Sequence, residues 1–394
     1  MKNFTFYCPT QVEFGRDGAD RVGALTAAFG GRKVLVHYGG GSAVRSGLLD
    51  RVCRSLEQSG IAYVTLGGVK PNPRLSLIRE GIALGRQEGV DFLLAVGGGS
   101  VIDSAKAIAY GLAMEGDVWD LYSKKAEAKA CLPLGSVLTI AAAGSETSNS
   151  SVITNDGTGE KRGYNNDICR CRFAVMDPTL TYTLPAYQTA SGCTDIMMHM
   201  LERYFHPGGT LSMAADGMTE ALLRSMLVCS RKVLEQPEDY DTRAEIMWTG
   251  SLAHNDLLQC GNGMRGDWAC HQLEHEMGGF YDVAHGAGLA AVWPAWARYV
   301  VDTDPARFAS FARKVMGVTE TEDKAAALAG IAAFEDHLRS LGMPVTVTEL
   351  LGRRLEEQEI LDLAHGCSFQ GTRTIGTLRV LDEADIAEVY RRAL

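Results

Sequence analysis

The first half of the chain alternates short apolar runs with segments whose apolar residues recur every three or four positions. Because the runs are continuously apolar, the strands they predict are expected to be buried on both faces. Strand, glycine-rich turn and helix in repetition are typical of a parallel sheet covered by helices. Strands are predicted at 34–38, 62–66, 92–96, 137–140 and 173–176, and helices at 48–56, 74–87 and 101–114.

The second half of the chain loses this β pattern from about Pro185 onward. Gly278 and Gly279 are expected to end the helix that begins at Trp268. We therefore predict an α/β + all-α protein, with an α/β domain at 1–185 followed by an all-α domain at 186–394. Helices are predicted at 186–205, 211–234, 242–258, 268–277 and 286–300, with further helical pieces up to residue 394.

Composition narrows the functional classes. The 394 residues are 46% hydrophobic and carry a formal charge of −10, which is ordinary for a folded protein and unsuited to nucleic acids or acidic membranes. No run is long enough to predict a signal peptide or a membrane span. Ten scattered cysteines without a CxxC pair indicate reduced thiols. We expect a cytoplasmic protein.

Two similar turns follow two predicted strands, Gly39-Gly40-Gly41-Ser42 and Gly97-Gly98-Gly99-Ser100. Glycines there let backbone N–H groups approach a pyrophosphate at a helix N-terminus. One such turn alone is more often a tight connection, and two together favour a dinucleotide site. No acid follows the strand at 34–38 to accept from a ribose 2′-hydroxyl, so we expect NADP(H) in preference to NAD(H). Arg45 is a candidate partner of the 2′-phosphate, although a solvated surface arginine is the commoner case.

A group of metal-ligand residues lies in the helical half. Asp195 and His199 are four residues apart and share one helix face, and His271 and His275 repeat this spacing. His285 follows after the two glycines. One aspartate with several histidines suits Fe²⁺ or Zn²⁺ and not Ca²⁺ or Mg²⁺. Five other histidines are interpreted as packed or solvated residues: His37, His206, His254, His337 and His365.

The segment 271–275 also matches the H-x-x-E-H pattern of inverted zinc peptidases. In that alternative His271 and His275 bind zinc and Glu274 is the general base. It gives no function to Asp195, to His199 or to either glycine-rich turn, and we rank it second. A zinc-stabilised binding module without activity is a further alternative, and it too leaves the glycine turns unexplained.

Taken together, these motifs resemble the iron-containing (group III) alcohol dehydrogenases over nearly the whole chain. Within that family the sequence is similar to the NADPH-dependent butanol dehydrogenase and aldehyde reductase branch at 38–42, 71–73 and 284–290. One departure is Ala143, where many members carry threonine. The family resemblance rests on 95–106, Gly144-Ser145-Glu146, Asp177-Pro178, Asp195 with His199, and the trio His271, His275 and His285.

The resemblance implies a Rossmann-like dinucleotide-binding domain followed by a helical metal-binding domain, an architecture shared with dehydroquinate synthase. A lyase of that kind is therefore a third alternative, but the region 186–300 lacks an evident cluster of basic residues for its anionic substrate. The resemblance also implies a homodimer and a small alcohol or aldehyde as substrate. It places the metal ligands at Asp195, His199, His271 and His285, with His275 as a non-ligand near the substrate and the nicotinamide. Because an imidazole titrates near neutral pH, His275 is our candidate for the catalytic proton relay, and packing beside the metal is the alternative. The resemblance places cofactor contacts at Gly39, Gly40, Ser42, Asn72, Gly98, Gly99, Ser100, Asp103, Thr139 and Lys161.

Overall fold

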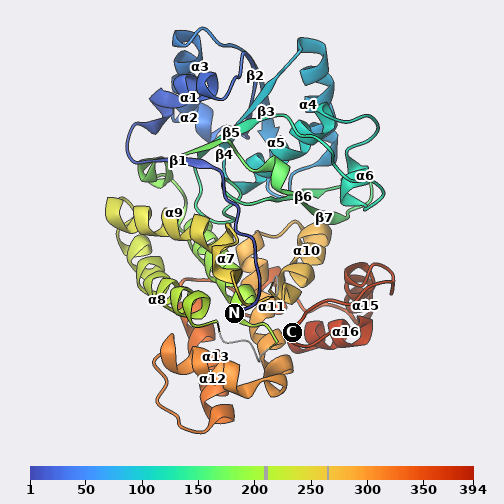
Figure 1. The fold of residues 1–394 in the computed structure, drawn as a ribbon. Helices are drawn as coiled ribbons and strands as arrows, with labels where there is room; N and C mark the ends of the chain where they lie inside the picture. The colour runs from blue at the N-terminus through green and yellow to red at the C-terminus, as the bar shows by residue number, and fades with distance from the viewer. Residues whose placement is uncertain (208–211, 264–265) are drawn as a thin grey trace. The chain divides into compact units, whose positions relative to one another are not determined.

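The computed structural model describes residues 1–207, 212–263 and 266–394. The chain divides into two compact units (Figure 1). The sheet unit is Tyr7–Leu184, and the helical unit is Pro185–Leu394 together with Met1–Phe6. The expected domain division assigned residues 1–6 to the sheet, whereas in the structure they group with the helices.

A six-stranded parallel sheet forms the centre of the sheet unit. Its middle strands are rich in Val, Leu and Phe and are almost completely buried, as expected for strands covered on both faces. In spatial order the strands are β1 (Gln11–Phe14), β8 (Phe173–Met176), β5 (Leu134–Leu138), β4 (Phe92–Gly97), β2 (Lys33–Gly39) and β3 (Ala62–Val69).

Helices cover both faces of this sheet (Figure 1). One layer pairs α1 (Val22–Ala28) with α3 (Leu48–Gln58), and the other pairs α4 (Leu75–Glu88) with α5 (Gly99–Leu112). The α1–α3 layer buries its apolar side chains against alternate residues of the strands, including Val34, Val36 and Leu94. The sheet unit also contains the short helices α2 (Ser42–Arg45) and α6 (Trp119–Tyr122), the hairpin β6 (Ser150–Thr154) with β7 (Lys161–Asn165), and the 3₁₀ turns η1 (Gly18–Arg21), η2 (Asp167–Cys169) and η3 (Pro178–Thr181).

The strand order reverses between β2 and β4. From β2 the chain moves outward to β3, and it then returns to place β4 on the other side of β2. Ligands of open parallel sheets bind outside the carboxyl ends of the strands at such a reversal. The turns that leave β2 and β4 are the two glycine-rich turns of the sequence.

The helical unit is organised around two buried helices, α7 (Ala186–Tyr204) and α11 (His285–Val300), which pack against each other. Every residue of α7 from Thr189 to Tyr204 is buried. No helix among the described residues is both long enough and apolar enough to cross a membrane. The other elements are α8 (Met213–Glu235), α9 (Tyr240–His254), η4 (Leu257–Gln259), α10 (Ala269–Tyr281), η5 (Val301–Thr303), α12 (Pro305–Lys314), α13 (Asp323–Ser340), α14 (Val347–Leu351), α15 (Glu357–Cys367) and α16 (Glu383–Arg392).

An aromatic core lies beside these central helices. Phe205 stacks on Phe308 with ring centroids 4.2 Å apart, and Trp293 of α11 meets Phe334 edge-on at 4.8 Å. Trp293 and Trp296 are both almost fully buried. Burial of these apolar side chains stabilises the helical unit and offsets the cost of burying the charged residues of α7.

The structure confirms most of the predicted elements and corrects four details. Strand β3 continues through Gly67 and Gly68 to Val69, and β5 lies three residues earlier than predicted at its start. Helix α10 continues through Gly278 and Gly279 to Tyr281, contrary to the prediction. Glycine costs only about 1 kcal/mol in a helix, which the packing of α10 on α11 and α15 outweighs. The short strands β1, β6 and β7 were not predicted. Residue 211, the predicted first residue of one helix, lies outside the described residues.

Candidate active site

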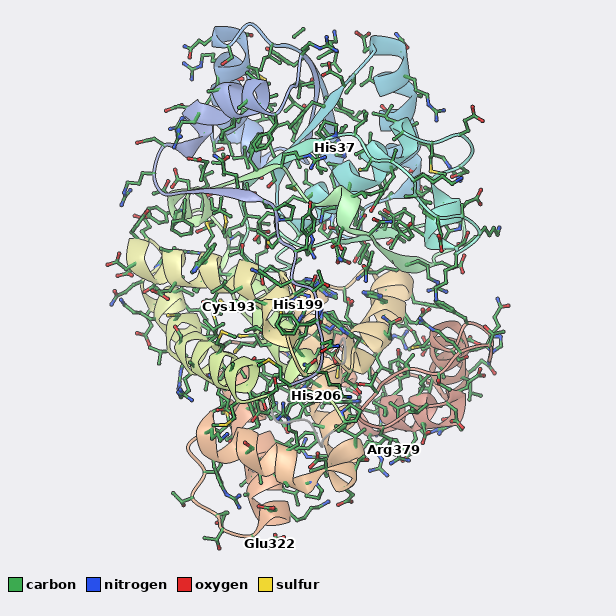
Figure 2. All side chains as sticks on the ribbon, viewed as in Figure 1. His37, Cys193, His199, His206, Glu322 and Arg379 are labelled. Carbon is green, nitrogen blue, oxygen red and sulfur yellow. The ribbon has the colours of Figure 1, made fainter. Side chains whose placement is uncertain are left out.

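Three buried side chains of the helical unit converge on one point. Asp195 and His199 lie one turn apart on α7, and His271 is on α10; one donor atom of each lies within 4.8 Å of the other two. His199 Nδ1 is 3.3 Å from Asp195 Oδ1, and His271 Nε2 is 3.8 Å from the same oxygen. His285, the first residue of α11, brings its Nε2 to 3.6 Å from Asp195 Oδ1. Figure 2 shows His199 within the interior of the helical unit.

The donor atoms of this group have no hydrogen-bond partners. Asp195 Oδ1, His199 Nδ1 and His271 Nε2 are all buried and unpaired. Buried polar atoms are nearly always hydrogen-bonded, and one carboxylate with three imidazoles is a donor set that divalent Fe or Zn accepts. The four side chains therefore fit a metal ion, and they are the four that the family resemblance implied, whereas spacing alone had left His275 as a fifth candidate.

Glu202 holds His271 in a defined orientation. Glu202 follows His199 by three residues on α7, and its Oε1 accepts hydrogen bonds from both the backbone N–H and the ring Nδ1–H of His271, each at 3.0 Å. Burial lowers the pKa of His271, but Asp195 and Glu202 outweigh this effect and raise it to about 9. The hydrogen bond from Nδ1 to Glu202 turns the other ring nitrogen, Nε2, toward Asp195.

Glu274 has the same relation to His285. Its side chain is completely buried, and Oε2 accepts a hydrogen bond from His285 Nδ1. Two glycines make this arrangement possible. A Cβ on Gly286 would lie 2.0 Å from the backbone oxygen of Ser191 on α7, and one on Gly288 would lie 2.8 Å from Cγ of Glu274. Both would be steric clashes, so glycine is required for α11 to approach α7 and to accommodate the glutamate.

Two further histidines surround the cluster. His275 is half-buried one turn after His271, and its ring centroid is 6.0 Å from that of His285. His254, which the sequence interpretation set aside, ends α9 with its ring centroid 4.1 Å from that of His199. No spacing rule connects His254 to the motif, because it lies on a separate helix.

Most of the residues predicted to contact a dinucleotide lie at the carboxyl ends of the strands of the sheet. We call this part of the sheet unit the dinucleotide edge. In the strand register Tyr38 pairs with Val96 and Gly97 pairs with Leu138, so the turns that follow β2, β4 and β5 begin side by side. This edge carries Gly39, Gly40, Ser42, Gly98, Gly99, Ser100 and Thr139. Asn72, buried with φ +54°, lies in the turn after β3, and Lys161 is the buried first residue of β7.

In the turn after β4, glycines leave the backbone at this edge without covering side chains. Gly98 caps α5, and the helix begins at Gly99, so the N–H groups of Gly98, Gly99 and Ser100 precede the first intrahelical hydrogen bonds, in which Val101 and Ile102 donate to the Gly98 oxygen. A Cβ on Gly99 would approach Cβ of Ala143 to 2.9 Å, and one on Gly98 would approach Ile140 to 3.0 Å. Helix N-termini of this kind favour phosphate groups.

Asp103 and Lys106 on α5 hold the adjoining segment 144–152. Asp103 accepts hydrogen bonds from Ser145 Oγ at 2.5 Å and from the backbone N–H of Val152 at 2.9 Å. Lys106 is fully buried, and its Nζ donates to the carbonyl oxygens of Ser145, Ser148 and Ser150 at 2.7–3.0 Å. The sequence interpretation assigned no role to Lys106, although a lysine in an otherwise apolar helix indicates a buried charge.

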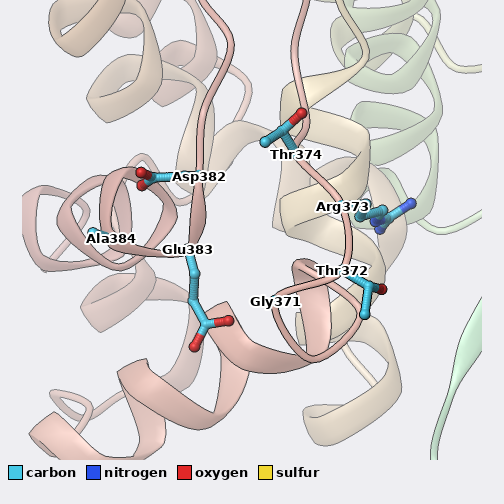
Figure 3. Close-up of a pocket in the computed structure, with 7 residues that line it drawn as sticks. All are labelled: Gly371, Thr372, Arg373, Thr374, Asp382, Glu383 and Ala384. Carbon is cyan, nitrogen blue, oxygen red and sulfur yellow. The ribbon is translucent and has the colours of Figure 1, made fainter.

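A separate cavity of about 610 Å³ lies near the C-terminus (Figure 3). It contains none of the predicted site residues. Its Glu383 already accepts hydrogen bonds from Ser368 and His365. The lining residues are Gly371, Thr372, Arg373, Thr374, Asp382, Glu383 and Ala384.

Comparison with known families and proteins agrees with this geometry. Residues 9–178 match the iron-containing alcohol dehydrogenase family, and residues 189–394 match the C-terminal domain of the same family. The chain belongs to the iron-containing alcohol dehydrogenase family. It is accordingly a metal-dependent oxidoreductase of alcohols or aldehydes, and the expectation from the sequence motifs is confirmed.

Several members of the family are similar over the full chain. The NADH-dependent butanol dehydrogenase A of Clostridium acetobutylicum is 38% identical, with 100% of both chains covered. The NADPH-dependent aldehyde reductase YqhD of Escherichia coli is 35% identical, with 89% of each covered. A crystal structure of NADH-dependent butanol dehydrogenase A from Thermotoga maritima superposes with a TM-score of 0.95 at 38% identity, covering 100% of this chain and 99% of that one.

The alternative activities are not favoured. A peptidase of the H-x-x-E-H type requires its glutamate to reach a water molecule, whereas Glu274 is completely buried and bonded to His285. The family assignment likewise gives no support to a lyase or to a binding module without activity.

Proposed function

We propose that the protein catalyses reversible hydride transfer between a nicotinamide dinucleotide, preferentially NADP(H), and a small alcohol or aldehyde. The metal ligands are Asp195, His199, His271 and His285. The observation that carries the proposal is the convergence of buried, unpaired donor atoms from Asp195, His199 and His271, with His285 Nε2 beside them. Residues 1–185 bind the dinucleotide, and residues 186–394 hold the metal and carry out catalysis.

When bound, Fe²⁺ or Zn²⁺ supplies Lewis acidity toward the substrate oxygen, and the nicotinamide supplies or accepts the hydride. The protein contributes alignment and the exclusion of water. His275 is half-buried beside His285, and its imidazole exchanges with solvent the proton that the substrate oxygen gains or loses.

The dinucleotide lies along the carboxyl edge of the sheet in this proposal. Backbone N–H groups at Gly98, Gly99 and Ser100 bind the pyrophosphate. The turn after β2, with Gly39, Gly40 and Ser42, accommodates the adenosine ribose. Asn72, Asp103, Thr139 and Lys161 complete the contacts.

The preference for NADP(H) rests on the turn that follows β2. This turn contains no acidic residue to repel a 2′-phosphate. The Arg45 guanidinium lies against the same turn, because a Cβ added to Gly41 would be 3.0 Å from Arg45 Nη1. The four similar butanol dehydrogenases, at 36–40% identity, are named NADH-dependent, two of them as probable, whereas YqhD at 35% identity is named NADPH-dependent.

Metal analysis combined with initial rates tests the whole proposal. We expect one Fe²⁺ or Zn²⁺ per chain, and oxidation of NADPH with butanal at a higher kcat/KM than NADH. A higher kcat/KM with NADH would overturn the 2′-phosphate preference alone. Peptide hydrolysis without nicotinamide turnover would favour the zinc peptidase instead.

The family also supports a homodimer in the cytoplasm as part of the proposal. None of the ten cysteines forms a disulfide, which suits a reducing compartment. A dimer has a mass of about 85 kDa, twice the 42.5 kDa of one chain, and light scattering during size-exclusion chromatography measures it directly.

A further inference from the structure

Two buried carboxylates lie beside the metal ligands without belonging to the ligand set. The side chains of Glu202 on α7 and Glu274 on α10 are 3% and 0% exposed. Burying a carboxylate is costly unless strong hydrogen bonds or an opposite charge compensate for it. Each glutamate therefore requires a specific partner.

Each glutamate has a different histidine of the ligand set as that partner. Glu202 Oε1 accepts from His271 Nδ1 at 3.0 Å, and Glu274 Oε2 accepts from His285 Nδ1. In both cases the other ring nitrogen, Nε2, lies within 4 Å of Asp195 Oδ1. The same pairing of a glutamate with a histidine thus occurs twice, once between α7 and α10 and once between α10 and α11. In both pairs the histidine Nε2 lies beside Asp195.

The third histidine of the group differs. His199 presents Nδ1 to Asp195, and its ring packs against that of His254 at 4.1 Å. Its backbone oxygen accepts from Arg203, a nearly fully buried guanidinium on the same helix. The Arg203 guanidinium also lies 3.7 Å from Asp256 Oδ1 and packs over the Trp268 ring.

We propose that Glu202 and Glu274 are positioning residues that fix the Nδ1–H tautomer and ring orientation of His271 and His285. The Nε2 atom of each ring then faces the metal, because a ligating histidine is oriented by the carboxylate that its other ring nitrogen is bonded to. This inference rests on the proposed function, because it requires Asp195, His199, His271 and His285 to bind the ion. It also replaces the general-base role that the H-x-x-E-H pattern gives to Glu274.

The test compares Glu202→Gln and Glu274→Gln with Glu220→Gln. Glu220 is a buried glutamate of α8 whose partners are Tyr204 and Lys314, away from the metal ligands. The dissociation constant for Zn²⁺ is measured by competition with a chromophoric chelator, and the visible spectrum of the Co²⁺-substituted protein reports the ligand geometry. We expect each test variant to bind Zn²⁺ about 10–100-fold more weakly, with a changed Co²⁺ spectrum. The control is expected to match the wild type.

Unchanged affinity and spectrum in both test variants would overturn the inference while leaving the proposed function intact. A wild-type protein that binds no divalent metal would instead overturn the proposed function. Should a glutamine variant fail to fold, Glu202→Asp and Glu274→Asp serve in its place. They keep the charge but withdraw the carboxylate from Nδ1, so the same weakening is expected.

Discussion

The proposed metal cluster and the proposed dinucleotide edge are built differently, the first from side chains and the second from backbone. In the helical unit, three helices bring buried side chains together, and the donor atoms of Asp195, His199 and His271 are unpaired in the interior. In the sheet unit, the site consists largely of backbone at the ends of β2, β4 and β5, and glycines keep it accessible. The metal cluster therefore depends on residue identity, whereas the dinucleotide edge depends on close approach of the chain.

The largest expected effect comes from removing a ligand. His285→Ala should leave little metal bound and reduce kcat/KM by more than the roughly 100-fold typical of losing a supporting residue. Metal per chain, measured by mass spectrometry of the purified protein, checks this. His365→Ala, at an exposed histidine paired with Glu383, is the control and should retain full metal. Full metal content in His285→Ala would remove His285 from the ligand set.

A large loss of stability is expected in the sheet unit on replacing Lys106. Lys106→Met leaves the buried carbonyl oxygens of Ser145, Ser148 and Ser150 without a donor, and we expect a loss of about 3–5 kcal/mol in the free energy of unfolding. Urea denaturation measures this loss, and metal content should remain unchanged in the folded protein. Lys314→Met, at a half-exposed lysine of the helical unit, is the matched control. Equal stability of the two variants would contradict the role given to Lys106.

Acid should weaken the sheet unit through His37. His37, labelled in Figure 2, donates a hydrogen bond from Nδ1 to the Leu66 oxygen and accepts one from Ser104 at Nε2. Burial lowers the pKa of His37 from 6.5 to about 4. As the pH falls, the unfolded chain binds the proton first, so stability is lost between pH 6.5 and 4. The loss amounts to about 3 kcal/mol at the lower limit. Urea denaturation at pH 7, 5.5 and 4.5 measures it. His37→Gln should reduce the pH dependence of the free energy of unfolding by that amount. An unaltered pH dependence in this variant would exclude His37 as its cause.

The smallest effect is expected from one methyl group at the dinucleotide edge. Gly99→Ala places a Cβ 2.9 Å from that of Ala143, and relief of the clash displaces the first turn of α5. We expect the dissociation constant for NADPH to rise about tenfold, equivalent to about 1.4 kcal/mol, with metal content unchanged. Fluorescence titration measures this constant. Gly217→Ala, at an open position of α8, should have no effect. Loss of metal in Gly99→Ala would contradict the independence of the two regions.

The two regions also differed in how far the sequence predicted them. The i, i+4 spacing of Asp195 and His199 predicts a shared helix face, but spacing alone left His275 among five candidate ligands. The set of four came from the family resemblance. Glu202 lies on the same face three residues after His199 and could have been found by extending that spacing. His254 could not, because its proximity to His199 depends on how α9 packs against α7.

At the dinucleotide edge, the sequence identified the glycine-rich turns but not their adjacency. That adjacency follows from the strand order, which places β4 between β2 and β5. The short strands β1, β6 and β7 were missed because four or five residues carry too little periodicity to distinguish them from loops.

The sequence by itself determined the α/β and all-α organisation, because this depends on the periodicity of apolar residues. Its motifs carried the resemblance to the family, and that resemblance implied the candidate ligands. Only the tertiary structure decided how Glu202 and Glu274 pair with His271 and His285, and that helix α10 continues through two glycines. These outcomes depend on packing between helices, in particular on the approach of α11 to α7 at Gly286. Contacts between residues distant in the chain are set by that packing and have no local signature in the sequence.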